Sequence, residues 1–144
     1  MDNDATGAII GLTVEKGFMD VYQAMMEGIC YESRVSLELL RQAGITLDTM
    51  RATGGGSRSM AWNQMKADIW RVTLDTLSVQ EAGTVGSIML AGLATDAYGS
   101  LEQAMAMTDT AARFTPSADA DRFDAPFARY RRVYEAVRPL QERL

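Results

Sequence analysis

The sequence predicts an α/β fold with a few-stranded sheet packed by several helices, and two patterns support this prediction. Three short runs, 7–13, 46–53 and 72–79, have the apolar or β-branched character of strands. The segments that follow them carry apolar residues three and four positions apart, which is typical of amphipathic helices. Strands and helices that alternate along a chain favour a sheet with crossover connections. The 144 residues suffice for one domain with a buried core.

The first third of the chain predicts two strands and one long helix. Residues 7–13 are a short apolar run between glycines, which indicates a buried strand. Residues 18–43 predict the helix. Asp20 and Gln23 are placed to form a capping pair at its start, and Gly44 suits the position just after its end. Residues 46–53 predict the next strand.

The remaining elements follow a triple glycine at 54–56. Ser57 or Ser59 is placed to cap a helix that runs to about Trp70. Residues 72–79 predict a third strand and residues 81–98 a further helix, with Gly99 as its stop. The rest predicts a short helix at 101–107, a loop at 114–124 and a C-terminal helix with an apolar stripe of Phe123, Phe127, Tyr130, Tyr134 and Val137. Three strands are few for so many helices, so we expect part of a larger fold.

The composition excludes several classes of function. A net charge of −5 argues against a nucleic-acid partner, which needs a basic face. No run approaches the roughly 18 apolar residues of a membrane span, and the polar N-terminus is not a signal peptide, so we expect a cytoplasmic protein without a membrane partner. With no histidine and the single cysteine Cys30, the chain by itself cannot form a Ser-His-Asp triad, a histidine metal site or a thiolate zinc site.

The triple glycine is the main candidate for a binding site. Glycine lets a ligand approach the backbone closely, and unpaired N–H groups at the start of the next helix favour an anion or a nucleotide. The same residues also suit a tight strand-to-helix turn with no ligand. The residues of the turn leave both interpretations open.

From residue 7 onward the chain resembles the C-terminal part of the FGGY family of carbohydrate kinases, most closely its xylulokinase-like branch. Residues 7–13, GAIIGLT, are similar to the family's G-A-x-x-G-L-T strand, and 23–29, QAMMEGI, to its R-A-x-x-E-G-I/V helix, with Gln23 where arginine is usual. The run 54–59, GGGSRS, with Trp62, Gln64, Ala67 and Asp68 after it, resembles G-G-G-A-K-S-x-x-W-x-Q-x-x-A-D. Glu81 and 86–92, GSIMLAG, follow the family's E…G-A-A-x-x-A-G pattern. Four motifs in register make the resemblance specific.

The resemblance implies part of a ribonuclease-H-like C-terminal domain of the actin, hexokinase and Hsp70 type, which binds ATP with Mg²⁺ and a sugar. By the same resemblance, Gly54 and Gly55 lie close to the nucleotide, Gly56 and Ser57 complete the turn, and Ser59 lies beside the adenine. Arg58 stands where lysine is common and is equally well explained as a solvated side chain.

The resemblance also implies what residues 1–144 lack. Family members are roughly three times longer, and their phosphate motif, much of the sugar site, the Mg²⁺ ligands and the catalytic aspartate lie in segments that match nothing here. We therefore expect an incomplete domain that is inactive alone, and we assign no catalytic role to Asp20, Asp48, Asp68 or Asp75. D-xylulose is the default sugar, and L-fuculose, ribulose, glycerol and erythritol remain open.

A second hypothesis is a non-catalytic, self-associating kinase-like module. An orphaned domain exposes apolar surface, which favours association, so under either hypothesis we expect a homo-oligomer. An unrelated dinucleotide-binding fold has little support, because neither G-x-G-x-x-G nor a phosphate-loop motif is present.

Overall fold

A three-stranded sheet lies at the centre of the computed structural model, which describes residues 6–79, 81–106 and 108–141. Its order is β1 (Thr49–Ala52), β2 (Thr73–Leu77) and β3 (Thr110–Phe114). β1 and β2 run parallel, with Thr49 opposite Thr73, and helix α2 (Met60–Trp70) forms the crossover between them. β3 runs antiparallel to β2, with a register shift between Thr76 and Leu77. The predicted strands at 46–53 and 72–79 are confirmed with shorter bounds.

The long helix α1 (Phe18–Gln42) confirms the prediction for residues 18–43. The backbone N–H of Gly17 donates to Asp20 Oδ2 at 2.9 Å, which caps the start of the helix. Gln23 instead donates to Glu27 at 2.8 Å, so the expected pair of Asp20 with Gln23 is wrong. Gly44 follows the end of the helix with φ of 84°, the left-handed conformation that favours glycine, as predicted.

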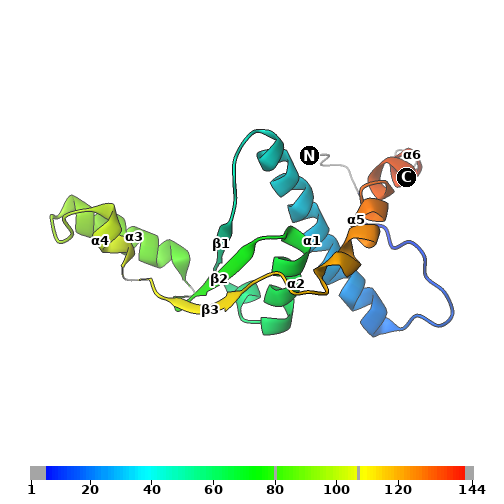
Figure 1. The fold of residues 1–144 in the computed structure, drawn as a ribbon, viewed down its shortest axis with the longest axis horizontal. Helices are drawn as coiled ribbons and strands as arrows, with labels where there is room; N and C mark the ends of the chain where they lie inside the picture. The colour runs from blue at the N-terminus through cyan, green and yellow to red at the C-terminus, as the bar shows by residue number, and fades with distance from the viewer. Residues whose placement is uncertain (1–5, 80, 107, 142–144) are drawn as a thin grey trace.

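The core lies on both sides of α2. On one side Ala67 packs on the sheet with Leu74 and Phe114. On the other side Ile69 packs against α1 and the C-terminal segment, in a cluster with Cys30, Tyr31, Phe123 and Phe127. Helix α2 therefore links the sheet to α1, and Figure 1 shows it between them.

Helices α3 (Ala82–Ala94) and α4 (Leu101–Met105) pack on each other and project from one end of the sheet (Figure 1). The helix predicted at 81–98 ends at Ala94, because Asp96 takes the left-handed conformation with φ of 57° and the Ala97 N–H donates back to the Gly92 carbonyl at 2.8 Å. Ser100 caps α4 by accepting a hydrogen bond from the Gln103 N–H at 3.2 Å. No helix in the described part of the chain is long and apolar enough to cross a membrane.

Three predictions for the ends of the chain are wrong. Residues 7–13 are exposed and form no strand, because they pair with neither edge of the sheet and an unpaired strand leaves its hydrogen bonds unmade. Residues 110–114 form β3, where a strand was not predicted and 114 was assigned to a loop. The C-terminal stripe is divided among the 3₁₀ helix η2 (Ala120–Phe123), α5 (Asp124–Tyr130) and α6 (Val133–Gln141). The break between α5 and α6 includes an i to i+3 bond from Arg132 N–H to the Arg129 carbonyl.

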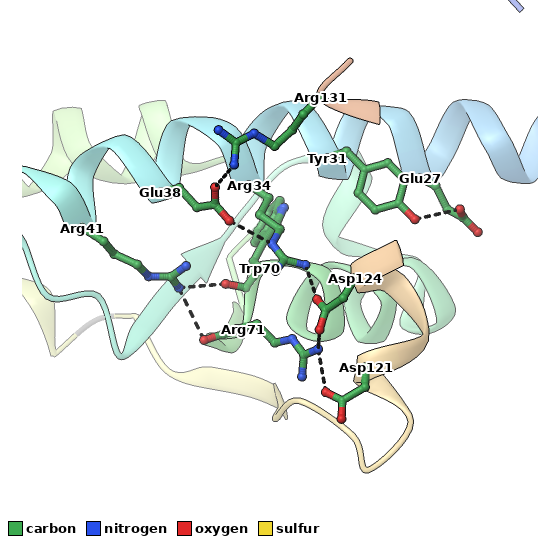
Figure 2. A network of polar contacts seen from close by, with 10 residues as sticks. All are labelled: Glu27, Tyr31, Arg34, Glu38, Arg41, Trp70, Arg71, Asp121, Asp124 and Arg131. Carbon is green, nitrogen blue, oxygen red and sulfur yellow. Dashed lines mark hydrogen bonds and ion pairs between the residues drawn. The ribbon is translucent and has the colours of Figure 1, made fainter. Parts of the chain in front are cut away.

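A polar network fastens the C-terminal segment to α1 and α2 (Figure 2). Arg34 on α1 and Arg71, just after α2, each donate to Asp124 at 2.9 Å, and Arg71 also pairs with Asp121 at 2.8 Å. These guanidinium groups hold the pKa of Asp124 below its usual range, with the hydrogen bond from Arg34 as the largest cause. Arg41 donates to the Trp70 carbonyl at 2.8 Å, which satisfies a carbonyl at the end of α2.

Candidate functional site

The glycine turn, residues 54–58, follows the carboxyl end of β1 and leads into α2. Gly54 has φ of 79° and ψ of −174°, a conformation that only glycine adopts without strain. Residues Gly55–Ser57 form one 3₁₀ turn, closed by the Ser57 N–H on the Gly54 carbonyl at 3.1 Å. The Ser57 hydroxyl donates to the same carbonyl at 2.7 Å. Ser57 therefore closes the turn through both its backbone N–H and its hydroxyl.

One side of the turn is bare backbone. A Cβ atom added at Gly54 or Gly55 would meet no other atom within 4 Å. Within residues 6–79, 81–106 and 108–141, the N–H groups of Gly55 and Gly56 have no hydrogen-bond acceptor. Backbone donors that have no acceptor of their own favour a ligand with acceptor oxygens or nitrogens.

The other side of the turn is closed. A Cβ atom at Gly56 would lie 3.0 Å from Cζ3 of Trp62, so the indole fills the space behind this glycine. The three glycines thus differ: Gly54 supplies the backbone conformation, Gly55 is open, and Gly56 permits close packing on Trp62.

Ser59 caps α2. Its Oγ accepts a hydrogen bond from the Trp62 N–H at 3.3 Å, and its backbone is extended. This confirms one of the two caps predicted from the sequence. Arg58 is exposed.

Two buried side chains of α2 hold the turn from beneath, and the sequence analysis missed them. Asn63 Nδ2 donates to the Ser57 carbonyl at 2.7 Å, and Lys66 Nζ donates to the Gly56 carbonyl at 3.0 Å. Lys66 Nζ also contacts Asn63 Oδ1 at 3.3 Å and lies 4.0 Å from the centre of the Trp62 ring. The spacing of 63 and 66 in the sequence could have revealed these two residues. Positions three apart share one face of a helix, and helical side chains tilt toward the N-terminus, which here is the end that follows the turn.

Burial determines the protonation behaviour beneath the turn. It lowers the pKa of Lys66, because the ammonium is removed from water. It also raises the pKa of the Cys30 thiol, which the neighbouring Trp62 side chain and the charge of Lys66 partly oppose. Cys30 is therefore a neutral part of the core.

Asp68 has a structural environment, as the sequence analysis expected. Its carboxylate is buried and accepts hydrogen bonds from the Ser117 N–H at 2.7 Å and from Gln64 at 2.9 Å. Gln64 also donates to the Thr115 carbonyl at 2.8 Å. The Q-x-x-A-D part of the motif thus fastens residues 115–117 to α2.

Asp75 lies on the central strand and pairs with Arg113 on β3 through two hydrogen bonds of 2.7 Å. The hydrogen bonds from Arg113 lower the pKa of Asp75. Asp20 serves as the helix cap described above and Asp48 lies before β1. The described residues contain no group of three or more acidic, cysteine or histidine side chains that would hold a metal ion.

The fold places the chain in the actin/hexokinase-like ATPase fold class. Its fold matches that of xylulose kinase from Lactobacillus acidophilus with a TM-score of 0.85 at 24% identity, over 94% of this chain and 28% of that one. It also matches Plasmodium falciparum glycerol kinase, solved with ADP, with a TM-score of 0.76 at 22% identity, over 90% of this chain and 26% of that one. These kinases have an actin/hexokinase-like fold.

The chain belongs to the FGGY family of carbohydrate kinases. Residues 1–95 match the family's C-terminal domain. Xylulose kinase of Bacillus subtilis (strain 168) is 30% identical over 145 aligned positions, which cover 99% of this chain and 29% of that protein. The chain therefore spans less than a third of the length of this relative.

Proposed function

We propose that residues 1–144 are the nucleotide-side portion of the C-terminal domain of an ATP-dependent sugar or polyol kinase. The kinase transfers the γ-phosphoryl group of ATP to a sugar hydroxyl, and we take a xylulose-like sugar as the default. One observation carries this proposal: the turn exposes the bare backbone of Gly54 and Gly55 at the entrance to α2. We propose a cytoplasmic location, where ATP is available as the substrate of such a kinase.

The turn suits a nucleotide for two reasons. The open side accepts a flat or bulky group without a side-chain clash. The N–H groups of Gly55 and Gly56 are donors for acceptor atoms of the ligand. Gly54, Gly55, Gly56, Ser57 and Ser59 are accordingly the nucleotide-binding residues of the proposal. Of these, Ser57 and Ser59 act by shaping the turn and capping α2.

The chain supplies binding and orientation in the proposed reaction. Phosphoryl transfer depends mainly on positioning and on charge stabilisation, and Mg²⁺ bound with ATP neutralises charge on the phosphate oxygens. Asp68 and Asp75 are held in structural hydrogen bonds, so neither is assigned as a base. Because the chain spans less than a third of its relative, we propose that other polypeptide segments provide the base and the sugar site, and that residues 1–144 alone are inactive.

Calorimetry with ADP tests the proposed site. A side chain at residue 55 would stand on the open side without straining the fold, so Gly55→Val should weaken ADP binding at least about tenfold, or 1.4 kcal/mol. Gly28→Val is the matched control, because a Cβ atom added at Gly28 also meets nothing within 4 Å and Gly28 belongs to α1, outside the turn. Equal ADP affinity for wild type and Gly55→Val would show that the turn is not the site.

A self-associating, non-catalytic module is the second candidate function. It is favoured by the large apolar side chains that are exposed before and at the start of α1, which are Ile9, Ile10, Leu12, Val14, Phe18 and Met19. Exposed apolar surface of this kind favours association. Sedimentation of wild type and of Ile10→Asp tests it. A dimer that the substitution dissociates supports the module, and a monomer at all concentrations refutes it.

A further inference from the structure

Lys66 is a buried cation without a carboxylate partner in the described residues. Its exposed fraction is 8%, and none of the ion pairs formed within those residues includes it. Burying an ammonium is costly unless a counter-charge or good hydrogen bonds compensate. The compensation here comes from the turn itself, through the Gly56 carbonyl at 3.0 Å, and from the Trp62 ring at 4.0 Å.

The two side chains beneath the turn act on consecutive carbonyls. Lys66 binds the carbonyl of Gly56, and Asn63 binds that of Ser57. They are one turn apart on α2 and contact each other, so they form one rigid support. Holding both carbonyls toward α2 fixes the two peptide planes that join the open glycines to the helix.

The same ammonium also holds Trp62. The indole and the Lys66 ammonium both adjoin the space behind Gly56, where an added Cβ atom would lie 3.0 Å from Trp62 Cζ3 and 3.7 Å from Lys66 Nζ. A cation over an aromatic ring contributes most when it is removed from water, as it is here. Lys66 is thereby connected to the turn by a hydrogen bond and by a packed ring.

We propose that Lys66 is a positioning residue, assisted by Asn63, that holds the glycine turn in the conformation with its Gly54–Gly55 side open to ligand. Its contribution to ligand affinity rests on the proposed function, whereas its effect on the turn does not. A buried charge lowers the stability of the fold. Lys66 is therefore expected to stabilise the conformation of the turn while it lowers the free energy of unfolding of the whole chain.

Lys66→Met is the main test, because methionine keeps the length and removes both the charge and the donor. Hydrogen exchange of the Ser57 and Arg58 amides, which close the turn, should be about tenfold faster or more in the ligand-free variant, as expected for a lost charged hydrogen bond. Global stability to urea should be equal to or higher than that of wild type. ADP affinity should fall at least about threefold.

Lys16→Met is the matched control, because Lys16 is half exposed and its one ion pair among the described residues is with the nearby Asp20 at 3.6 Å. It should change neither exchange at the turn nor ADP affinity. Asn63→Ala is a second variant that should loosen the same two amides. If Lys66→Met unfolds the chain, the exchange rates of Asn63→Ala decide the question.

The outcomes separate this proposal from the function on which it rests. If wild type does not bind ADP but Lys66→Met loosens the turn, the proposed function fails and the positioning role stands. If ADP binds and the exchange of Ser57 and Arg58 is unchanged in both variants, the positioning role is refuted. A loosened turn with unchanged ADP affinity would refute the contribution of Lys66 to binding.

Discussion

Replacing Gly54 by alanine tests whether the backbone of the turn is as unusual as its dihedral angles indicate. Its φ of 79° and ψ of −174° lie in a region where a side chain costs about 1–3 kcal/mol. An added Cβ would meet nothing within 4 Å, so packing contributes nothing and the whole effect is conformational. We expect the free energy of unfolding to fall by about 1–3 kcal/mol, or the melting temperature to fall by roughly 3–9 °C for a chain of this length.

Gly55→Ala is the matched control for Gly54→Ala. Gly55 is equally open but its φ is not in the left-handed region, so alanine is tolerated and restricts the unfolded chain. That substitution should be neutral or stabilise by about 0.4–1 kcal/mol. The two variants should therefore differ by about 1–4 kcal/mol in urea denaturation. Equal stability of the two variants would refute the assigned conformation of Gly54.

Two further predictions concern the carboxylates. Asp124→Asn removes the carboxylate that two arginines share and should lower the free energy of unfolding by about 1–2 kcal/mol. Asp121 is highly exposed and has one ion-pair partner, Arg71, in the described part of the chain, so Asp121→Asn should lower the free energy of unfolding by less than about 0.5 kcal/mol. Urea denaturation measures both, and equal costs would contradict the shared role of Asp124. Asp75 has a lowered pKa in the folded chain, so its stabilising effect is present above the unfolded pKa and is lost as the pH falls through the folded value. Asp75→Asn should accordingly reduce the loss of stability between pH 6 and pH 3, and an unchanged loss would show that the pair with Arg113 does not contribute.

Local signals in the sequence were sufficient for α1, α2, β1 and β2. Gly44 marks the end of α1 and Ser59 the start of α2, and each acts through its own backbone or side chain. The sequence also located the glycine turn, because a triple glycine before a helix is a local pattern. It did not show which glycine is strained, which is open and which is packed.

Non-local contacts decided the elements that the sequence did not predict. Residues 7–13 have the apolar character of a strand but find no partner strand among the residues that the structure describes. β3 has a partner strand but little strand character in its sequence. Its residues 110–114 include two alanines and one buried aromatic, and its pairing with β2 makes it a strand. Lys66 was overlooked because a lysine is normally expected on the solvated side of a helix, and its partners are backbone carbonyls that no residue pattern reveals.

The attachment of α3 and α4 has a consequence for how this part of the chain can vary. The chain leaves the sheet at Leu77 and re-enters it at Thr110, and these two residues are paired neighbours. The Ser78 N–H donates to the Asp109 carbonyl at 2.9 Å, which closes the base of the projection. Because the base of the projection is closed in this way, changes in how α3 packs on α4 are expected to leave the register of β2 and β3 intact.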